Sequence, residues 1–362
     1  MDGLFRCDSG VLCTGQQDNK NMKVIITGGG GFLGVQLCKK LLDRPQLTSP
    51  KGTVESVEEI VLFDARLHNV PDPLRHPTLV EGKPKVVCVE GSIDDVDSVR
   101  NAIGTDPHTS VFHLASMVSG ECEERFDDAL RINLDGGRNI FEAVRAIPGL
   151  PRLVFASSIA CFGGEAMQPP CDDRTKLTPE TTYGMTKVIC ELLINDYSRK
   201  GFFDGRSARL PTVIIRPGKP NTAASSWASG MFREPLNGES CHLPVDWDQR
   251  HPMTGYRTVI DSLIAIHELP AISLGSDRGI GLPARSITPR LADKALKDFA
   301  IERNLRSLGP IEDRPDARIR GIVKNWPVEV DGSRGLALGL PPAPTLPEII
   351  GNYWDDFGAK TS

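Results

Sequence analysis

The sequence predicts an α/β fold in which a parallel β-sheet is covered by helices on both faces. Short apolar runs rich in β-branched residues recur along the chain, at residues 24–26, 60–63, 86–89, 111–114, 153–155 and 212–215. Stretches whose apolar residues have helical spacing lie between many of them, as at 32–42, 121–146 and 180–199. The runs are continuous rather than alternating, which is typical of strands buried on both faces in a parallel sheet.

The elements suggest two domains of unequal regularity. All six runs fall within residues 23–216, which we expect to form the sheet domain. The preceding residues 1–22 are polar and aperiodic, so we expect a disordered tail. Residues 45–58 contain two prolines, a glycine and several Ser and Thr residues, which predicts a loop. Prolines recur after the sheet domain, so residues 217–362 are expected to form mainly a smaller, irregular substrate domain, with about 253–275 returning to the sheet.

Composition and charge exclude several functional classes. Of the 362 residues, 40% are hydrophobic and 25% are charged, as in soluble globular proteins. A formal net charge of −5 does not suit a nucleic-acid binder or a polybasic membrane anchor. No apolar run approaches the roughly 18–20 residues that span a bilayer, and residues 1–21 lack the apolar core of a secretory signal. Nine cysteines at irregular spacings, none as Cys-x-x-Cys, predict reduced thiols in a cytoplasmic protein without a metal site.

A glycine cluster separates the first apolar run from the first helical stretch. Gly28, Gly31 and Gly34 have the spacing GxxGxxG. Glycines permit a tight turn and let a pyrophosphate approach backbone amides, while the N-terminus of the following helix attracts the anion. A plain strand-to-helix turn is the alternative, but the position of the cluster favours dinucleotide binding. The sheet is therefore expected to be of the doubly wound, Rossmann type.

The acid that ends the second apolar run bears on the choice of dinucleotide. Asp64 stands where a carboxylate accepts hydrogen bonds from both ribose hydroxyls of NAD and repels the 2′-phosphate of NADP. Arg66 keeps the second cofactor open, because a nearby arginine can accommodate that phosphate. A solvated acid at a strand end is the remaining alternative. We expect the cofactor to be NAD.

A tyrosine and a lysine share one face of the helix predicted over residues 180–199. Tyr183 and Lys187 are four positions apart, so both side chains project to the same side. A neighbouring ammonium lowers the pKa of a tyrosine, which then exchanges a proton with a substrate hydroxyl more readily. Ser158 follows the fifth apolar run, where its hydroxyl would hold the substrate oxygen. An ordinary helix-surface pair and a turn-capping serine are the alternatives.

Taken together, these residues resemble the extended short-chain dehydrogenase/reductase superfamily, of the NAD-dependent epimerase/dehydratase type. The resemblance spans nearly all of residues 23–270 and includes Leu114-Ala115-Ser116 and Asn133. It implies that Tyr183 is the general base, that Lys187 lowers the tyrosine pKa and binds ribose, and that Ser158 positions the hydroxyl. Asn133 would support Lys187 through a water molecule. The implied cofactor contacts are Gly28, Gly31, Phe32, Leu33, Gly34, Asp64, Ser92, Ile93, Leu114, Ala115, Tyr183, Lys187 and Pro217. Ser92 departs from the superfamily, which usually has an aspartate there for the adenine amine.

Later stretches, at 209–212, 216–221 and 233–239, resemble the members of that superfamily that oxidise a four-carbon sugar acid at C2 with NAD. The resemblance therefore implies oxidation of an erythronate-like sugar acid to its 2-oxo acid. An anionic substrate requires a cation near its carboxylate. The expected substrate contacts are three candidate cations, Lys219, Arg233 and Arg257, together with Ser119, Ser158 and Tyr183.

Two other functions remain open on the sequence. A nucleotide-sugar epimerase or dehydratase of the same superfamily would require room for a nucleoside diphosphate around residues 217–257. A non-catalytic NAD-binding regulator would have no chemical need for the intact Ser158, Tyr183 and Lys187 set.

The helices near 121–146 and 180–199 carry more apolar residues than one sheet-facing stripe requires. The resemblance implies that such helices pair across a two-fold axis, so we expect a homodimer.

Overall fold

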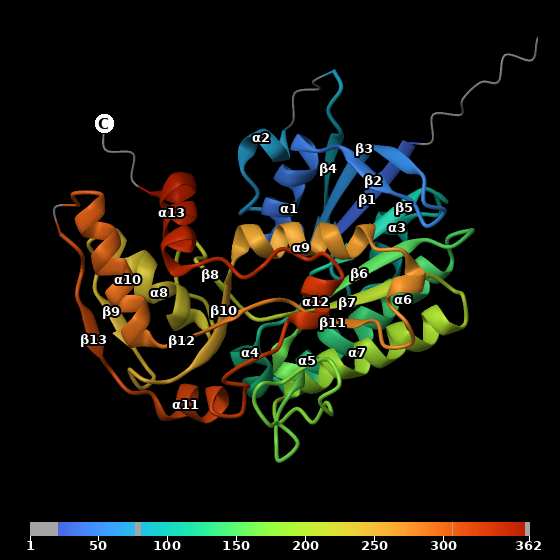
Figure 1. Ribbon diagram of the computed structural model, residues 1–362. Coiled ribbons are helices and arrows are strands. Elements are labelled where there is room, and N and C mark those ends of the chain that lie inside the picture. Colours follow the sequence, from blue (N-terminus) through green and yellow to red (C-terminus); the bar gives the residue numbers. More distant parts are fainter. Residues whose placement is uncertain (1–20, 77–80, 306, 359–362) are drawn as a thin grey trace, which may run out of the picture.

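The computed structural model describes residues 21–76, 81–305 and 307–358 (Figure 1). The tail expected over residues 1–22 lies outside the described residues, apart from Asn21 and Met22. These two residues begin strand β1 (Asn21–Thr27), two positions earlier than expected, and the Met22 side chain is buried. Within the described ranges, no helix is both long and apolar enough to cross a membrane.

The central sheet has eight strands. Across it the order is β11, β7, β6, β5, β1 and β3, and β3 pairs on its other edge with both β4 and β2. Every pairing is parallel except that of β2 with β3. The bounds are β2 (Gln46–Thr48), β3 (Val54–Asp64), β4 (Lys85–Glu90), β5 (Thr109–His113), β6 (Arg152–Ser158), β7 (Asp204–Leu210) and β11 (Gly279–Gly281). The chain winds outward in both directions from β1, so the crevice beyond the carboxyl ends of β1 and β5 is the expected ligand position.

Helices cover both faces of this sheet (Figure 1). On one face, α1 (Phe32–Asp43) and α9 (Tyr256–Glu268) share an apolar core with the strands, to which the short α2 (Asp72–Arg75) adds Leu74. On the other face, the core is shared with α3 (Val96–Ile103), α6 (Gly136–Arg145) and α7 (Thr182–Arg199). This double coverage explains the continuous apolar runs and confirms the predicted doubly wound α/β class.

The remaining C-terminal elements gather beside the sheet (Figure 1). Helices α8 (Ser226–Leu236), α10 (Pro289–Glu302) and α13 (Leu346–Phe357) enclose a further apolar core. Two small sheets accompany them, β8 (Thr212–Ile214) with β10 (His251–Gly255) and β12 (Arg285–Ile287), and β9 (Cys241–Leu243) with β13 (Ile311–Asp313). Helices α11 (Ala317–Val323) and α12 (Ser333–Ala337) complete this part. We propose that these elements form the substrate domain, and that α9 belongs with the sheet.

The prediction of a loop over residues 45–58 was wrong, because this segment contains a β-hairpin. Strand β2 pairs antiparallel with the first residues of β3. The pattern was obscured because the exposed and buried positions carry unexpected residues: Val54 is exposed, whereas the buried Glu55 carboxylate lies 3.0 Å from Nδ1 of His108. A strand with an inward carboxylate and an outward valine does not show the usual alternation.

The sixth strand of the sheet was also placed wrongly. It is β7, whereas residues 212–214 form β8 in a different sheet. Strand β7 has the sequence DGRSARL, and every one of its residues is buried. Its charges are buried because they are paired: Arg206 contacts Asp204, and Arg209 lies 2.7 Å from Glu191. A search for apolar runs cannot detect such a strand.

The helix predicted over residues 121–146 is divided into four parts. These are α4 (Ser119–Glu124), α5 (Phe126–Ala129), the π-helical turn η1 (Leu130–Asp135) and α6. The first break falls at Arg125, whose φ of −129° and ψ of 68° are not helical. The π-helical turn has a consequence for the site, because it carries the buried Asn133.

Candidate active site

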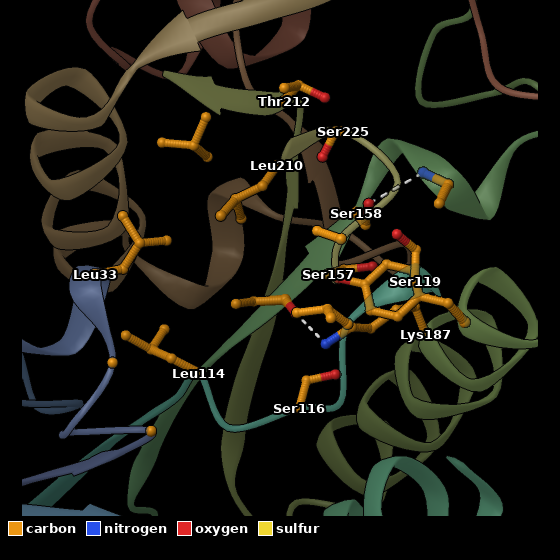
Figure 2. A pocket seen from close by; sticks show the side chains of 18 of the residues that line it. Leu33, Leu114, Ser116, Ser119, Ser157, Ser158, Lys187, Leu210, Thr212 and Ser225 are labelled. Atoms are coloured by element: carbon orange, nitrogen blue, oxygen red, sulfur yellow. Dashed lines mark hydrogen bonds between the residues drawn. The ribbon is translucent and has the colours of Figure 1, made fainter. Parts of the chain in front are cut away.

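A cavity of about 320 Å³ lies at the carboxyl ends of β1, β5 and β6 (Figure 2). It is lined by the glycine loop with the start of α1, the loop after β5, the end of β6, helix α7 and residues 210–225, and Trp326 adds a side chain from further along the chain. Figure 2 shows Leu33, Leu114 and Leu210 toward one end and Ser119, Ser158 and Lys187 toward the other. The sequence-predicted residues that line the cavity are Gly28, Gly31, Phe32, Leu33, Gly34, Leu114, Ser119, Ser158, Tyr183 and Lys187.

The glycine loop has the geometry that a pyrophosphate requires. Gly28 has a φ of +73°, and a Cβ on Gly34 would lie 2.3 Å from the Gly28 carbonyl oxygen, so neither position tolerates a side chain. Helix α1 begins directly after the loop, and no side chain caps its N-terminus. The first backbone N–H groups of α1 are therefore available to an anion, and this end of the cavity fits the phosphates of a dinucleotide.

Asp64 lies beside this loop at the end of β3. Its carboxylate accepts hydrogen bonds from the backbone N–H groups of Gly30 and Arg66, each at 3.0 Å. These two bonds fix the orientation of the carboxylate, and each oxygen retains a lone pair for another donor. The position fits the ribose contact expected of Asp64, although Asp64 does not itself line the cavity.

The residues expected around the adenine lie next to β4 rather than in the cavity. The Ser92 hydroxyl donates to the Asp94 carboxylate, which also pairs with Arg131 from η1. The sequence therefore does provide an acid in this loop, two positions after the serine. Ile93 packs close to Gly136, and the Ala115 backbone N–H donates to the Thr27 hydroxyl at 3.3 Å.

Ser158, Tyr183 and Lys187 meet at the other end of the cavity. Ser158 is the last residue of β6, and its Oγ accepts the Ala160 backbone N–H at 3.1 Å. Helix α7 brings the other two residues: Nζ of Lys187 donates to the Ala156 carbonyl at 2.9 Å and lies 5.3 Å from the centre of the Tyr183 ring. The hydrogen bonds of Ser158 and Lys187 are drawn in Figure 2. The three expected catalytic groups therefore share one space.

The electrostatics of the tyrosine differ from the expectation. Burial raises the pKa of Tyr183 above its ordinary value, and a hydrogen bond with Ser158 opposes this rise only in part. Burial also lowers the pKa of Lys187 to about 8. The role expected of Lys187, lowering the pKa of Tyr183, stays a prediction, and burial acts on the tyrosine in the opposite direction. Desolvation is the larger effect, because it penalises tyrosinate and ammonium alike.

Asn133 lies beneath the site and contacts both the loop after β5 and helix α7. Its Oδ1 accepts the Met117 backbone N–H at 2.7 Å, and its Nδ2 donates to the Met117 carbonyl at 3.3 Å and to the Thr186 hydroxyl at 3.5 Å. It makes no direct hydrogen bond to Lys187. The amide instead holds the loop after β5, which lines the cavity, against helix α7.

Sequence reasoning assigned no role to a buried acid on the same helix. Glu191 lies one turn after Lys187 and accepts the Ser157 hydroxyl at 2.5 Å. Arg209 of β7 donates to the same carboxylate, at 2.7 Å for its closest nitrogen. The contacts join the residue before Ser158 to the helix that carries Tyr183. The detectable signal was a glutamate at the helical repeat of Lys187.

The cations expected to bind a substrate carboxylate are not brought to the cavity. Arg257 bonds to Asp356 and Asn352, and Lys219 is exposed outside the lining. Arg233 is buried and pairs with Glu234 at 2.5 Å. Pro217 does not line the cavity, but the preceding Arg216 does. Further lining residues that the sequence did not single out as site residues are Thr212, Asn221, Ser225 and Trp326.

Comparison with known proteins identifies the class that this fold and site define. The chain belongs to the NAD dependent epimerase/dehydratase family, whose model matches residues 24–271. This membership confirms the predicted NAD-dependent oxidoreductase of the extended short-chain dehydrogenase/reductase type. Family membership alone does not distinguish between substrates.

Particular relatives narrow the comparison. A D-erythronate dehydrogenase from Cupriavidus necator is 39% identical over 341 residues, which cover 93% of this chain and 99% of the relative. A D-erythronate dehydrogenase from Haemophilus influenzae is 37% identical over 332 residues, covering 92% and 98%. Among solved structures, a nucleoside-diphosphate-sugar epimerase from Agrobacterium tumefaciens has a TM-score of 0.80 at 34% identity, covering 94% of this chain and 96% of that chain.

Proposed function

We propose that this protein oxidises the C2 hydroxyl of a small sugar acid of the D-erythronate type to the 2-oxo acid, with NAD as the hydride acceptor. The observation that carries the proposal is the meeting of the glycine loop with Ser158, Tyr183 and Lys187 in one cavity. The similarity to two D-erythronate dehydrogenases over nearly the whole chain supports the substrate class.

In the proposed mechanism, the chain's own residues handle the proton. Ser158 donates a hydrogen bond to the C2 oxygen, and Tyr183 removes the hydroxyl proton as hydride leaves C2. Lys187, held on the Ala156 carbonyl, keeps a positive charge near the tyrosine oxygen and so stabilises the tyrosinate that accepts this proton. The cofactor held by the glycine loop would supply the hydride acceptor for this step.

The tyrosine and the lysine are best treated as one titrating pair. Loss of one proton from the pair gives either a neutral lysine or a tyrosinate beside an ammonium, and both forms contain the same number of protons. The pair therefore loses its first proton near the pKa of about 8 that burial gives Lys187. The form with tyrosinate and ammonium is the one that accepts the substrate proton.

The second candidate is a nucleotide-sugar epimerase, favoured by the solved structure with a TM-score of 0.80. The two functions predict different fates for the hydride. A dehydrogenase releases NADH in amounts equal to the substrate oxidised, whereas an epimerase returns the hydride to the sugar and accumulates none. NADH release also separates a dehydrogenase from a non-catalytic NAD-binding regulator, because such a regulator converts neither a sugar acid nor a nucleotide sugar.

The test is a screen of four- to six-carbon sugar acids with the full-length protein and NAD, following NADH absorbance. We expect D-erythronate to react, and the neutral polyol erythritol to react far more slowly. Equal rates with erythritol would contradict the sugar-acid assignment. Conversion of a UDP-sugar without NADH accumulation would establish the epimerase instead.

We also propose that the protein is a homodimer through helix α7. Met185, Val188, Ile189 and Leu192 are spaced at i, i+3, i+4 and i+7, so they form one apolar stripe. The first three are only half-buried, and Leu192 is 59% exposed. Light scattering at micromolar concentration should give twice the mass of one chain. Leu192→Glu should shift the measured mass toward that of a single chain. A monomer mass for the wild type would refute the dimer.

A further inference from the structure

The cavity has an unbalanced charge. Among the residues of the described chain that line it, the only charged side chains are Lys187 and Arg216, and no aspartate or glutamate accompanies them. The remaining polar lining consists of neutral groups, including Ser119, Thr212 and Ser225. A cavity with two cations and no acid favours an anionic occupant.

The two cations are placed differently. Lys187 is committed to the Ala156 carbonyl and lies against the Tyr183 ring. Arg216 follows β8, in the segment that forms the opposite side of the cavity. One guanidinium nitrogen of Arg216 donates to the Lys219 carbonyl. No carboxylate of the described residues lies within 4.0 Å of the guanidinium, so within that part of the chain its charge has no ion-pair partner. Burial correspondingly lowers the pKa of Arg216.

The backbone of Arg216 is held firmly from behind. Its N–H donates to the Ser229 hydroxyl at 3.1 Å, and its carbonyl accepts a guanidinium N–H of Arg233 at 2.8 Å. Arg233 is only 2% exposed and is anchored by Glu234 on the same helix, α8. Two buried groups of α8 therefore fix the position from which the Arg216 side chain extends.

We propose that Arg216 binds the substrate carboxylate, and that Arg233 is a positioning residue that holds Arg216 in place. The proposal rests on the proposed function, and it specifies the ligand class as 2-hydroxy carboxylates that carry further hydroxyls. Guanidinium forms paired hydrogen bonds with a carboxylate, whereas the neutral Thr212, Asn221 and Ser225 from the same segment suit sugar hydroxyls. The charged end of the substrate would then lie away from Lys187, with C2 near Tyr183.

A binding experiment tests Arg216 without requiring turnover. D-erythronate is titrated into the complex of the full-length protein with NADH, and NADH fluorescence is followed. Arg216→Gln should weaken erythronate binding by about 10- to 100-fold, as expected for loss of a charge-assisted hydrogen-bonded pair. Arg216→Lys should retain part of the affinity. Lys219→Gln is the matched control, because Lys219 is exposed outside the cavity and should bind like the wild type.

A kinetic experiment separates recognition of the charge from general damage. The ratio of kcat/KM for erythronate to that for erythronamide, its neutral amide, should collapse in Arg216→Gln, while kcat/KM for the amide stays near the wild-type value. Arg233→Lys should lower the same ratio to a smaller extent, because the shorter side chain keeps a charge beside Glu234 but reaches the Arg216 carbonyl less well. A purely structural role for Arg233 would lower both rates together and would leave the ratio unchanged.

The outcomes distinguish this proposal from the proposed function. Unchanged erythronate affinity in Arg216→Gln overturns the assignment of Arg216, even if the wild type oxidises erythronate. If the wild type binds erythronate without oxidising it, and Arg216→Gln abolishes this binding, the assignment of Arg216 is supported. The proposed oxidation is then overturned. If no sugar acid binds the wild-type complex, both proposals are overturned.

Discussion

The two sides of the cavity are built in different ways. The glycine-loop side consists of backbone that follows directly from β1 into α1, and its shape depends on the absence of side chains at Gly28 and Gly34. The opposite side, residues 210–225, is an irregular segment held by distant partners. Ser119 Oγ accepts the Ala224 N–H at 3.2 Å, and Thr222 donates to Glu121 at 2.8 Å.

This difference shows which kind of function each side supports. A backbone loop can bind the pyrophosphate of a cofactor that many enzymes share, and the local sequence specifies the shape of that loop. A side-chain surface recognises one substrate, and its position depends on helices α4 and α8 as much as on its own residues. The predictions below test whether the two sides act separately.

Tyr183→Phe tests the junction of the two sides and should have the largest effect. The substitution removes one oxygen and keeps the ring, so both ligands should still bind. We expect kcat to fall by at least about 10²-fold, the lower range for a positioned general base. Single-turnover NADH formation measures the rate, and NADH fluorescence checks that the cofactor binds. Near-normal turnover would show that another group is the base.

Gly34→Ala should damage only the glycine-loop side. Its Cβ would lie 2.3 Å from the Gly28 carbonyl oxygen, so the loop must move away from the anion. The NADH dissociation constant should rise at least about tenfold, equivalent to ~1.4 kcal/mol of lost binding free energy. Gly321→Ala is the control, because nothing lies within 4 Å of a Cβ at that position. Unchanged NADH affinity in Gly34→Ala would contradict the phosphate assignment.

The pH dependence should reveal the coupled pair. Oxidation requires the pair after it has lost one proton, so kcat/KM for erythronate should rise by up to about tenfold per pH unit below an apparent pKa near 8. Reduction of the 2-oxo acid requires the protonated pair, so its kcat/KM should be level below this pKa and should fall by up to about tenfold per pH unit above it. Profiles in both directions test this expectation. Slopes of the same sign in the two directions would exclude the pair as the controlling group.

Asp64→Ala should have the smallest effect, confined to cofactor choice. Removing the carboxylate removes its repulsion of a 2′-phosphate, which should narrow the preference for NAD over NADP by about fivefold, the effect of roughly 1 kcal/mol between partly solvated charges. The ratio of kcat/KM for the two cofactors measures it. Asp298→Ala, a surface acid of α10, serves as the control. A wild type that prefers NADP would make Arg66 the determinant.

Much of the fold was predictable because continuous apolar runs mark strands that are covered on both faces. The errors in strand assignment share one cause. Strand β7 buries Arg206 beside Asp204 of the same strand and Arg209 against Glu191 of α7, and β3 buries Glu55. Hydropathy treats charge as exposure, so it cannot detect a buried charge whose partner lies on another element.

For the candidate site as well, local sequence patterns were predictable and contacts between distant residues were not. The glycine cluster that begins at Gly28 and the pair formed by Tyr183 and Lys187 are each local sequence patterns. The structure places both patterns on one cavity, as the sequence predicted. The choice among cations was not local. Lys219 and Arg257 were chosen by their position after the sixth run, whereas the cavity contains Arg216 because α8 holds its backbone. That contact could be found only with the chain folded.

The aromatic contacts of Phe32 link the glycine loop to the far end of the chain. The Phe32 ring, at the first residue of α1, lies 5.1 Å from the ring of Tyr256 and 6.1 Å from that of Phe357 in α13. During synthesis, the loop leaves the ribosome before Tyr256 and Phe357 have been added to the chain. The cofactor site therefore acquires these aromatic neighbours only after Phe357 has been translated, so a nascent chain that stops before Phe357 would hold NAD less firmly than a chain that includes it.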